Sequence, residues 1–233
     1  MNESSGPQTP ETLGYHELRT IVGVIGVLLP FVLAIGFMLK HGFTFEQSIS
    51  AYYYTYMRNV FVGSLCAIGL FLVSTRGYDA RDEIAGKLAC VFAVIVALCP
   101  TTSVCCPAKW QRIVGTVHLT SAALLFSTLA YFCLKLFVIS KRPGGPSPEK
   151  LQRNKVYKMC GWVIVGCIAG IMVFKFFLVT SPEPVLSAYP PVVFSAESIA
   201  IWAFGIAWLI KGELFLKDKA TPPGPPPNST QKP

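Results

Sequence analysis

The stretch from Thr20 to Met38 reads TIVGVIGVLLPFVLAIGFM and contains no charged residue. At a rise of 1.5 Å per helical residue, a stretch of this length covers roughly 30 Å, the thickness of the hydrocarbon core of a bilayer. Five further apolar stretches follow at 59–75, 84–100, 113–139, 157–179 and 191–210. The sequence therefore predicts an all-α fold, a polytopic transmembrane helix bundle with six spans.

The rest of the chain is short and leaves no room for a separate soluble domain. Of its 233 residues, 52% are hydrophobic and only 14% are charged, and the mean hydropathy is +0.52. We expect an N-terminal tail over 1–18, the bundle over 19–211 and a proline-rich, disordered tail over 212–233. Residues 1–18 contain no lysine or arginine, unlike the start of a signal peptide, so we expect the first stretch to be a retained helix.

The net charge of +8 is distributed unevenly along the chain. If the N-terminus is cytoplasmic, fourteen of the twenty lysines and arginines fall in cytoplasmic segments and four in external ones. This asymmetry predicts that both termini are cytoplasmic, in a plasma membrane or a bacterial inner membrane. We therefore expect the basic residues to set the topology and contact membrane lipids, and we expect no nucleic-acid partner.

Four ionisable side chains are expected at a similar depth below the outer face of the membrane. His118 and Glu197 each lie about six residues inside a span, or roughly 9 Å, and Lys175 lies roughly 7 Å inside. Arg58 opens the second span at the same face. Charged groups at such depths are costly unless they are paired or hydrated, so they favour the bundle interior. The pattern predicts a polar pocket open to the outer leaflet and bounded by spans two, four, five and six.

Two interpretations of these residues remain open. In the first, the Glu197 carboxylate pairs with Arg58 or Lys175 in a ligand or proton site, and His118 is a hydrogen-bond partner or proton carrier. Further hydroxyl groups would come from Ser48, Ser50 and Ser198. In the second, the same groups only tie helices together, and Lys175 extends outward to the membrane surface. The shared depth can also be a coincidence.

Glycines and cysteines give weaker signals. Gly166 and Gly170 form a small-xxx-small pair that predicts close helix packing on the fifth span. Cys99, Cys105 and Cys106 lie near the outer face, where a disulfide, free thiols or binding of a soft metal ion are all possible. The three histidines are scattered along the chain, so we predict no metal site and no cofactor.

One segment carries a family resemblance. It reads Ser48-Ile-Ser-Ala-Tyr52-Tyr-Tyr-Thr-Tyr-Met-Arg58-Asn-Val-Phe61-Val-Gly63, and it is followed by Gly69, Phe71 and Arg76-Gly77-Tyr78-Asp79. This segment resembles the hallmark of an uncharacterised family of bacterial six-helix integral membrane proteins, and Gly115-Thr-Val-His118 and Glu197 continue the likeness.

A serine-rich loop leading into a span remotely resembles the alkaline ceramidase and adiponectin-receptor superfamily of membrane hydrolases. That resemblance would imply a seven-helix bundle with a histidine-bound zinc. This chain has six apolar stretches, has Tyr54 where a histidine is wanted and lacks paired histidines near its end, so the hydrolase chemistry is not carried over.

The function predicted from these observations is binding without catalysis. We expect an integral membrane protein that holds a lipid, a small polar ligand or a partner in the outer pocket. The alternatives are a proton-coupled secondary transporter that uses Glu197 and His118 as a relay, and a lipid-modifying membrane enzyme. No Walker loop, Gly-x-Ser-x-Gly elbow or dinucleotide fingerprint is present, and the sequence specifies no oligomeric state.

Overall fold

The computed structural model describes residues 14–74, 79–102, 108–140, 145–178 and 191–216. These residues form six α-helices and two short helical segments, with no strand. The elements are α1 (Tyr15–His41), the 3₁₀-helix η1 (Ser50–Tyr54), α2 (Arg58–Ser74), α3 (Ala80–Leu98), α4 (Lys109–Tyr131), the π-helical turn η2 (Phe132–Leu136), α5 (Pro148–Leu178) and α6 (Val192–Lys211). The prediction of an all-helical fold is confirmed.

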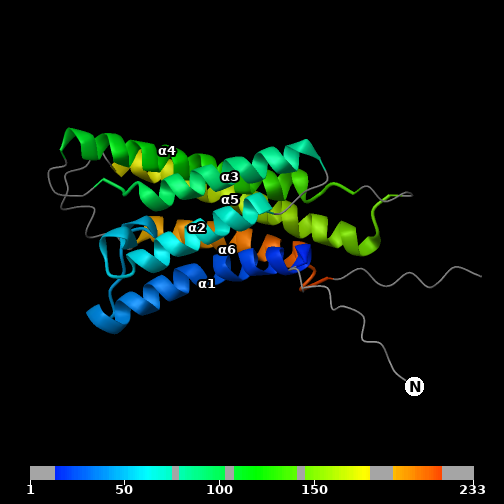
Figure 1. Ribbon diagram of the computed structural model, residues 1–233, viewed down its shortest axis with the longest axis horizontal. Helices are drawn as coiled ribbons and strands as arrows, with labels where there is room; N and C mark the ends of the chain where they lie inside the picture. The colour runs from blue at the N-terminus through cyan, green and yellow to red at the C-terminus, as the bar shows by residue number, and fades with distance from the viewer. Residues whose placement is uncertain (1–13, 75–78, 103–107, 141–144, 179–190, 217–233) are drawn as a thin grey trace, which may run out of the picture.

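The six α-helices form a closed ring. Each helix packs against the next one in the chain, and α6 packs against α1 to close the circle. The helices run along the long axis of the molecule (Figure 1), with the start of α1 and the end of α6 at one end and η1 at the other. We call these the terminal end and the η1 end. His16 Nδ1 and Glu213 Oε2 lie 4.0 Å apart at the terminal end.

Four helices are long and apolar enough to cross a membrane, so the protein has the composition of a membrane protein. The four segments are His16–His41, Lys109–Leu136, Pro148–Lys175 and Val192–Lys211. The second predicted span corresponds to α2, which is apolar but has only 17 residues. The remaining helix, α3, has 19 residues, and its first two turns carry Arg81, Asp82, Glu83 and Lys87. The predicted count of six spans therefore goes beyond what length and composition alone establish.

The fifth helix begins nine residues before the predicted span, at Pro148 instead of 157. Its added turns are polar, yet two of their cations are buried. Lys150 Nζ donates a hydrogen bond to the Phe137 carbonyl at 2.5 Å, and Arg153 Nη1 donates to the Leu216 carbonyl at 2.7 Å. These backbone carbonyls belong to the segments that follow η2 and α6. The first turns of α5 therefore bind both of these segments at the terminal end.

Glycines allow the closest helix contacts, but at positions that differ from the predicted pair. A Cβ placed on Gly205 of α6 would lie 2.9 Å from the Gly23 carbonyl oxygen of α1 and 2.8 Å from Val27 Cγ2. A Cβ on Gly166 or Gly170 would meet nothing within 4 Å. The small-xxx-small pair of α5 therefore faces open space, and the tight small-residue contact joins α1 to α6 instead.

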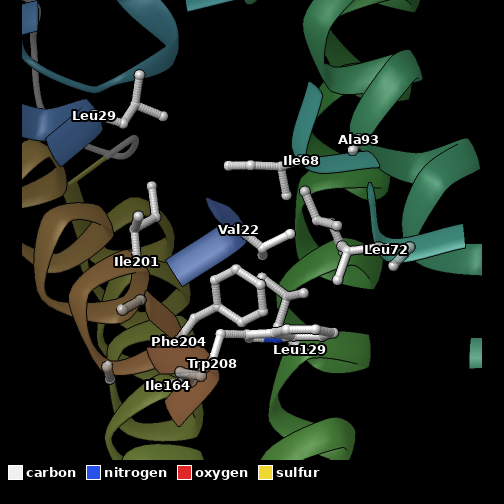
Figure 2. Packing of buried hydrophobic residues seen from close by; sticks show 14 of the residues in the cluster. Val22, Leu29, Ile68, Leu72, Ala93, Leu129, Ile164, Ile201, Phe204 and Trp208 are labelled. Atoms are coloured by element: carbon white, nitrogen blue, oxygen red, sulfur yellow. The ribbon is translucent and has the colours of Figure 1, made fainter. Parts of the chain in front are cut away.

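Aromatic side chains fill the core towards the terminal end. Trp208 of α6 is 1% exposed, and its ring lies 5.2 Å from Phe137 and 5.8 Å from both Phe132 and Phe204, measured between centroids. Figure 2 shows Trp208 and Phe204 beside Leu129 of α4, with Ile164 of α5 nearby. This packing joins α6 to the π-helical turn at the end of α4, so the ring has a solid centre at this level.

Candidate functional site

A cavity lies inside the helix ring, between the aromatic core and η1. Its volume is about 50 Å³. Five helices and η1 contribute to its lining, which is formed by Leu29, Ile49, Ser50, Phe61, Leu65, Ile68, Val96, His118, Ala122, Leu125, Phe126, Leu129, Glu197, Ile201 and Phe204. Figure 2 labels four of these lining residues, Leu29, Ile68, Leu129 and Ile201, which belong to α1, α2, α4 and α6.

The polar groups of this lining are grouped towards the η1 end. Ser50 belongs to η1, Glu197 is the sixth residue of α6, and His118 is the tenth residue of α4, which starts at the same end. The other lining side chains are apolar. The cavity therefore has a polar head and an apolar body, in contrast to the polar pocket predicted from the sequence.

Glu197 connects α6 to the segment that leads into η1. Its Oε2 accepts a hydrogen bond from the Ile49 backbone N–H at 2.7 Å. A second bond joins the same segments, because the Phe194 N–H donates to the Gln47 carbonyl at 3.0 Å. Within the described part of the chain Oε1 has no hydrogen-bond partner, so this oxygen remains available to a molecule in the cavity.

His118 is 4% exposed and is oriented by the end of α3. Its Nδ1 lies 2.6 Å from the Cys99 carbonyl oxygen. Since a carbonyl can only accept, Nδ1 carries the proton and donates this bond, which leaves Nε2 as the nitrogen for a molecule in the cavity. α3 stops before Pro100, and the carbonyls of its last turn have no helical partners, so Cys99 is free to accept.

The three candidate serines have different surroundings. Ser50 lines the cavity and is 7% exposed, and its Oγ lies 3.3 Å from Ser48 Oγ. Ser48 Oγ also accepts the Ala51 N–H at 3.1 Å, which stabilises the first turn of η1. Ser198 is buried, but its hydroxyl donates to the Phe194 carbonyl of its own helix at 2.7 Å. In the described residues, none of these three hydroxyls is hydrogen-bonded to His118.

Neither of the two predicted cationic partners pairs with Glu197. Arg58 is exposed at the start of α2, where its Nη2 donates to the Tyr53 hydroxyl at 2.6 Å and its guanidinium carbon lies 4.2 Å from the centre of the Tyr53 ring. Lys175 is also exposed. Neither residue lines the cavity.

The helix η1 covers the cavity as an inserted segment. Tyr52 is fully buried, and its ring packs 5.6 Å from Phe37 of α1 and 6.0 Å from Phe194 of α6. Burial raises the pKa of the Tyr52 phenol above its usual value, so this ring stays neutral. The structure therefore places the central side chain of η1 inside the bundle.

The predicted disulfide depends on residues outside the described ones. Cys99 is a free thiol in the structure, as are the five other described cysteines, which are Cys66, Cys90, Cys133, Cys160 and Cys167. Cys105 and Cys106 lie outside the described residues, so pairing with them stays a prediction. No group of three histidine, cysteine or acidic side chains in the described ranges is arranged to hold a metal ion.

Sequence reasoning missed the two backbone groups that orient the site. These are the Ile49 N–H, which binds Glu197, and the Cys99 carbonyl, which binds His118. Pro100 gave a usable signal for the second, because helices end before a proline and leave free carbonyls. The pocket predicted from the sequence also lacked α1 and α3 as walls, and it included α5, which contributes no lining residue.

Comparison with known proteins gives no family assignment, since no family model, curated protein or solved structure matches this chain. The class that the fold and composition define is a helical membrane protein with a cavity inside its helix ring.

Proposed function

We propose that this protein is an integral membrane protein with six spans and cytoplasmic termini, and that it binds a small amphiphilic molecule inside the helix ring. The observation that carries the proposal is the meeting of His118, Glu197 and Ser50 at one end of a single cavity whose other walls are apolar. A plasma membrane or a bacterial inner membrane is the proposed location.

The closed ring of helices favours six membrane spans rather than four. The two helices that fall short of the usual criteria, α2 and α3, pack between α1 and α4, and each contacts its neighbours in the ring. A bundle in which α1 and α4 cross the membrane while the helices between them do not would break this side-by-side packing. An even number of spans places both ends of the chain on one side, and the basic segments favour the cytoplasm for that side.

The cavity supports a short amphiphile as the ligand. Typical drug-sized sites measure roughly 300–1,000 Å³, whereas this cavity measures about 50 Å³, so a whole phospholipid does not fit. Glu197 Oε1 can accept a hydrogen bond from a hydroxyl group, and His118 Nε2 can accept another or act through water. An alcohol of about three carbons satisfies both the polar end and the apolar body within this volume.

Filling the cavity is expected to abolish binding without breaking the fold. Ala122 lines the cavity on α4, and Ala122→Phe places a ring in the volume that the ligand needs. The probe is a short alcohol that carries a photoactivatable diazirine, and mass spectrometry of digested protein maps its attachment. We expect labelling of α4 and α6 in the wild type, competition by 1-propanol, and a loss of about tenfold or more in Ala122→Phe.

The adjacent residue supplies the control. Ala123 does not line the cavity, so Ala123→Phe changes the same helix by the same side chain and should retain the label. Equal labelling of all three proteins, or labelling confined to the lipid-facing surface, contradicts the proposed site. Unchanged melting temperatures of the two variants show that the loss of labelling is not a loss of folding.

Proton-coupled transport is the second candidate, favoured by the presence of two titratable side chains in one cavity. A volume of about 50 Å³ holds roughly three or four waters, enough to link His118 to Glu197. In liposomes, uptake of a short amphiphilic substrate should then depend on an imposed pH gradient and be lost in Glu197→Gln. Binding without gradient-dependent uptake favours the first candidate instead.

A further inference from the structure

Two grooves run along the outer surface of the bundle on either side of α4. The α3–α4 groove has a volume of about 440 Å³, and the α4–α5 groove has a volume of about 410 Å³. Ser127 and Tyr131 border both grooves, so they form a ridge between them. Lys135 continues this ridge four residues after Tyr131 and borders the α4–α5 groove. Neither groove shares a lining residue with the cavity inside the ring, although α3 and α4 contribute residues to the cavity as well.

Each groove is apolar along its length and carries a cation towards the terminal end. Arg81, the second residue of α3, borders the α3–α4 groove together with Ile84, Leu88 and Phe92. Lys135 belongs to η2, the π-helical turn that ends α4 and also packs against α3. π-Helical turns are rare and are frequent at functional sites. The two cations therefore lie at the same end of the bundle, one on each side of the ridge.

Within the described residues these two cations have no protein partner, unlike Lys87 nearby. Arg81 and Lys135 are exposed, and the described residues give neither of them an ion pair or a hydrogen bond. One turn and a half further along α3, Lys87 is neutralised by Glu83, with Nζ 2.6 Å from Oε1. Basic side chains that flank apolar grooves between membrane helices match the phosphate and the acyl chains of a phospholipid.

We propose that one anionic diacyl phospholipid sits astride α4, with one acyl chain in each groove and its phosphate between Arg81 and Lys135. The aliphatic stems of both side chains lie against apolar groove walls while their charged ends reach the headgroup. Tyr131 separates the two chains below the headgroup. This site rests on the membrane-embedded state of the proposed function, but it uses none of the residues of the internal cavity.

The test is lipid retention measured by native mass spectrometry. The full-length protein is released from nanodiscs that contain equal amounts of phosphatidylglycerol and phosphatidylcholine. We expect the wild type to retain one phosphatidylglycerol molecule in preference to phosphatidylcholine. Arg81→Gln and Lys135→Gln should each lower that preference by about fivefold, and the double variant by about twentyfold or more.

Three further variants separate this site from general charge and from the cavity. Lys87→Gln removes a paired lysine from the same helix and should leave the preference unchanged. Ala169→Trp fills the α4–α5 groove without a change of charge and should lower retention of the lipid. Ala122→Phe, which blocks the internal cavity, should leave retention intact. Equal retention of both lipids by the wild type, or an effect of Lys87→Gln as large as that of Arg81→Gln, overturns the proposal.

Discussion

Replacement of Glu197 by alanine is expected to release η1 from α6 and to open the cavity to exchange with its surroundings. The Ile49 N–H donates to Glu197 Oε2 at 2.7 Å, and loss of this acceptor leaves a buried N–H without a partner, which costs about 1–3 kcal/mol. Hydrogen exchange at the Ile49 amide should therefore accelerate by about ten- to a hundredfold, and labelling by the diazirine alcohol should be lost.

Two variants serve as controls for Glu197→Ala. Glu197→Gln keeps an oxygen that can accept the Ile49 N–H, so amide exchange should stay slow while the cavity loses its acceptor charge. Ser198→Ala removes a neighbouring buried hydroxyl that bonds only within α6, so it should change neither measurement. If Glu197→Ala leaves Ile49 exchange at the wild-type rate, then Glu197 does not hold η1 in place.

Gly205→Leu is expected to have the largest effect on stability. A Cβ at this position would already lie 2.8 Å from Val27 Cγ2 and 2.9 Å from the Gly23 carbonyl oxygen, so α1 and α6 must separate to accommodate it. Overpacking of this kind costs about 1–3 kcal/mol or more. Denaturation in detergent should show a loss of that size in the free energy of unfolding.

Gly166→Leu is the matched control for this prediction. A Cβ at Gly166 meets nothing within 4 Å, so the same substitution on α5 should change the free energy of unfolding by about 0.5 kcal/mol or less. Loss of stability in Gly166→Leu equal to that in Gly205→Leu would mean that α1 and α6 do not close the ring at this contact.

The depth of a side chain could be predicted from the sequence, but its direction around the helix could not. Helical rise placed His118 and Glu197 at one level, and the structure brings both to one cavity. The same argument placed Arg58 and Lys175 at that level, yet both are exposed and lie outside the lining. Spans that are apolar all round give little rotational information, because lipid and protein interior accept the same side chains.

Glycine spacing was a poor guide for a related reason. The pair at Gly166 and Gly170 fits the small-xxx-small pattern but faces open space, whereas Gly205 meets Gly23 from a helix far away in the chain. A pattern within one helix shows that a close approach is possible there, and only the arrangement of the whole ring decides which helix makes it. Backbone partners such as the Cys99 carbonyl are set by that arrangement in the same way.

The central claim is that His118 and Glu197 face one internal cavity that holds a small amphiphile. The most direct measurement is an experimental density map of the protein purified together with molecules from its own membrane. We expect density inside the ring, between α4 and α6, that ends within hydrogen-bond distance of Glu197 Oε1 and His118 Nε2. A map in which these two side chains point to separate, lipid-facing surfaces would contradict the account.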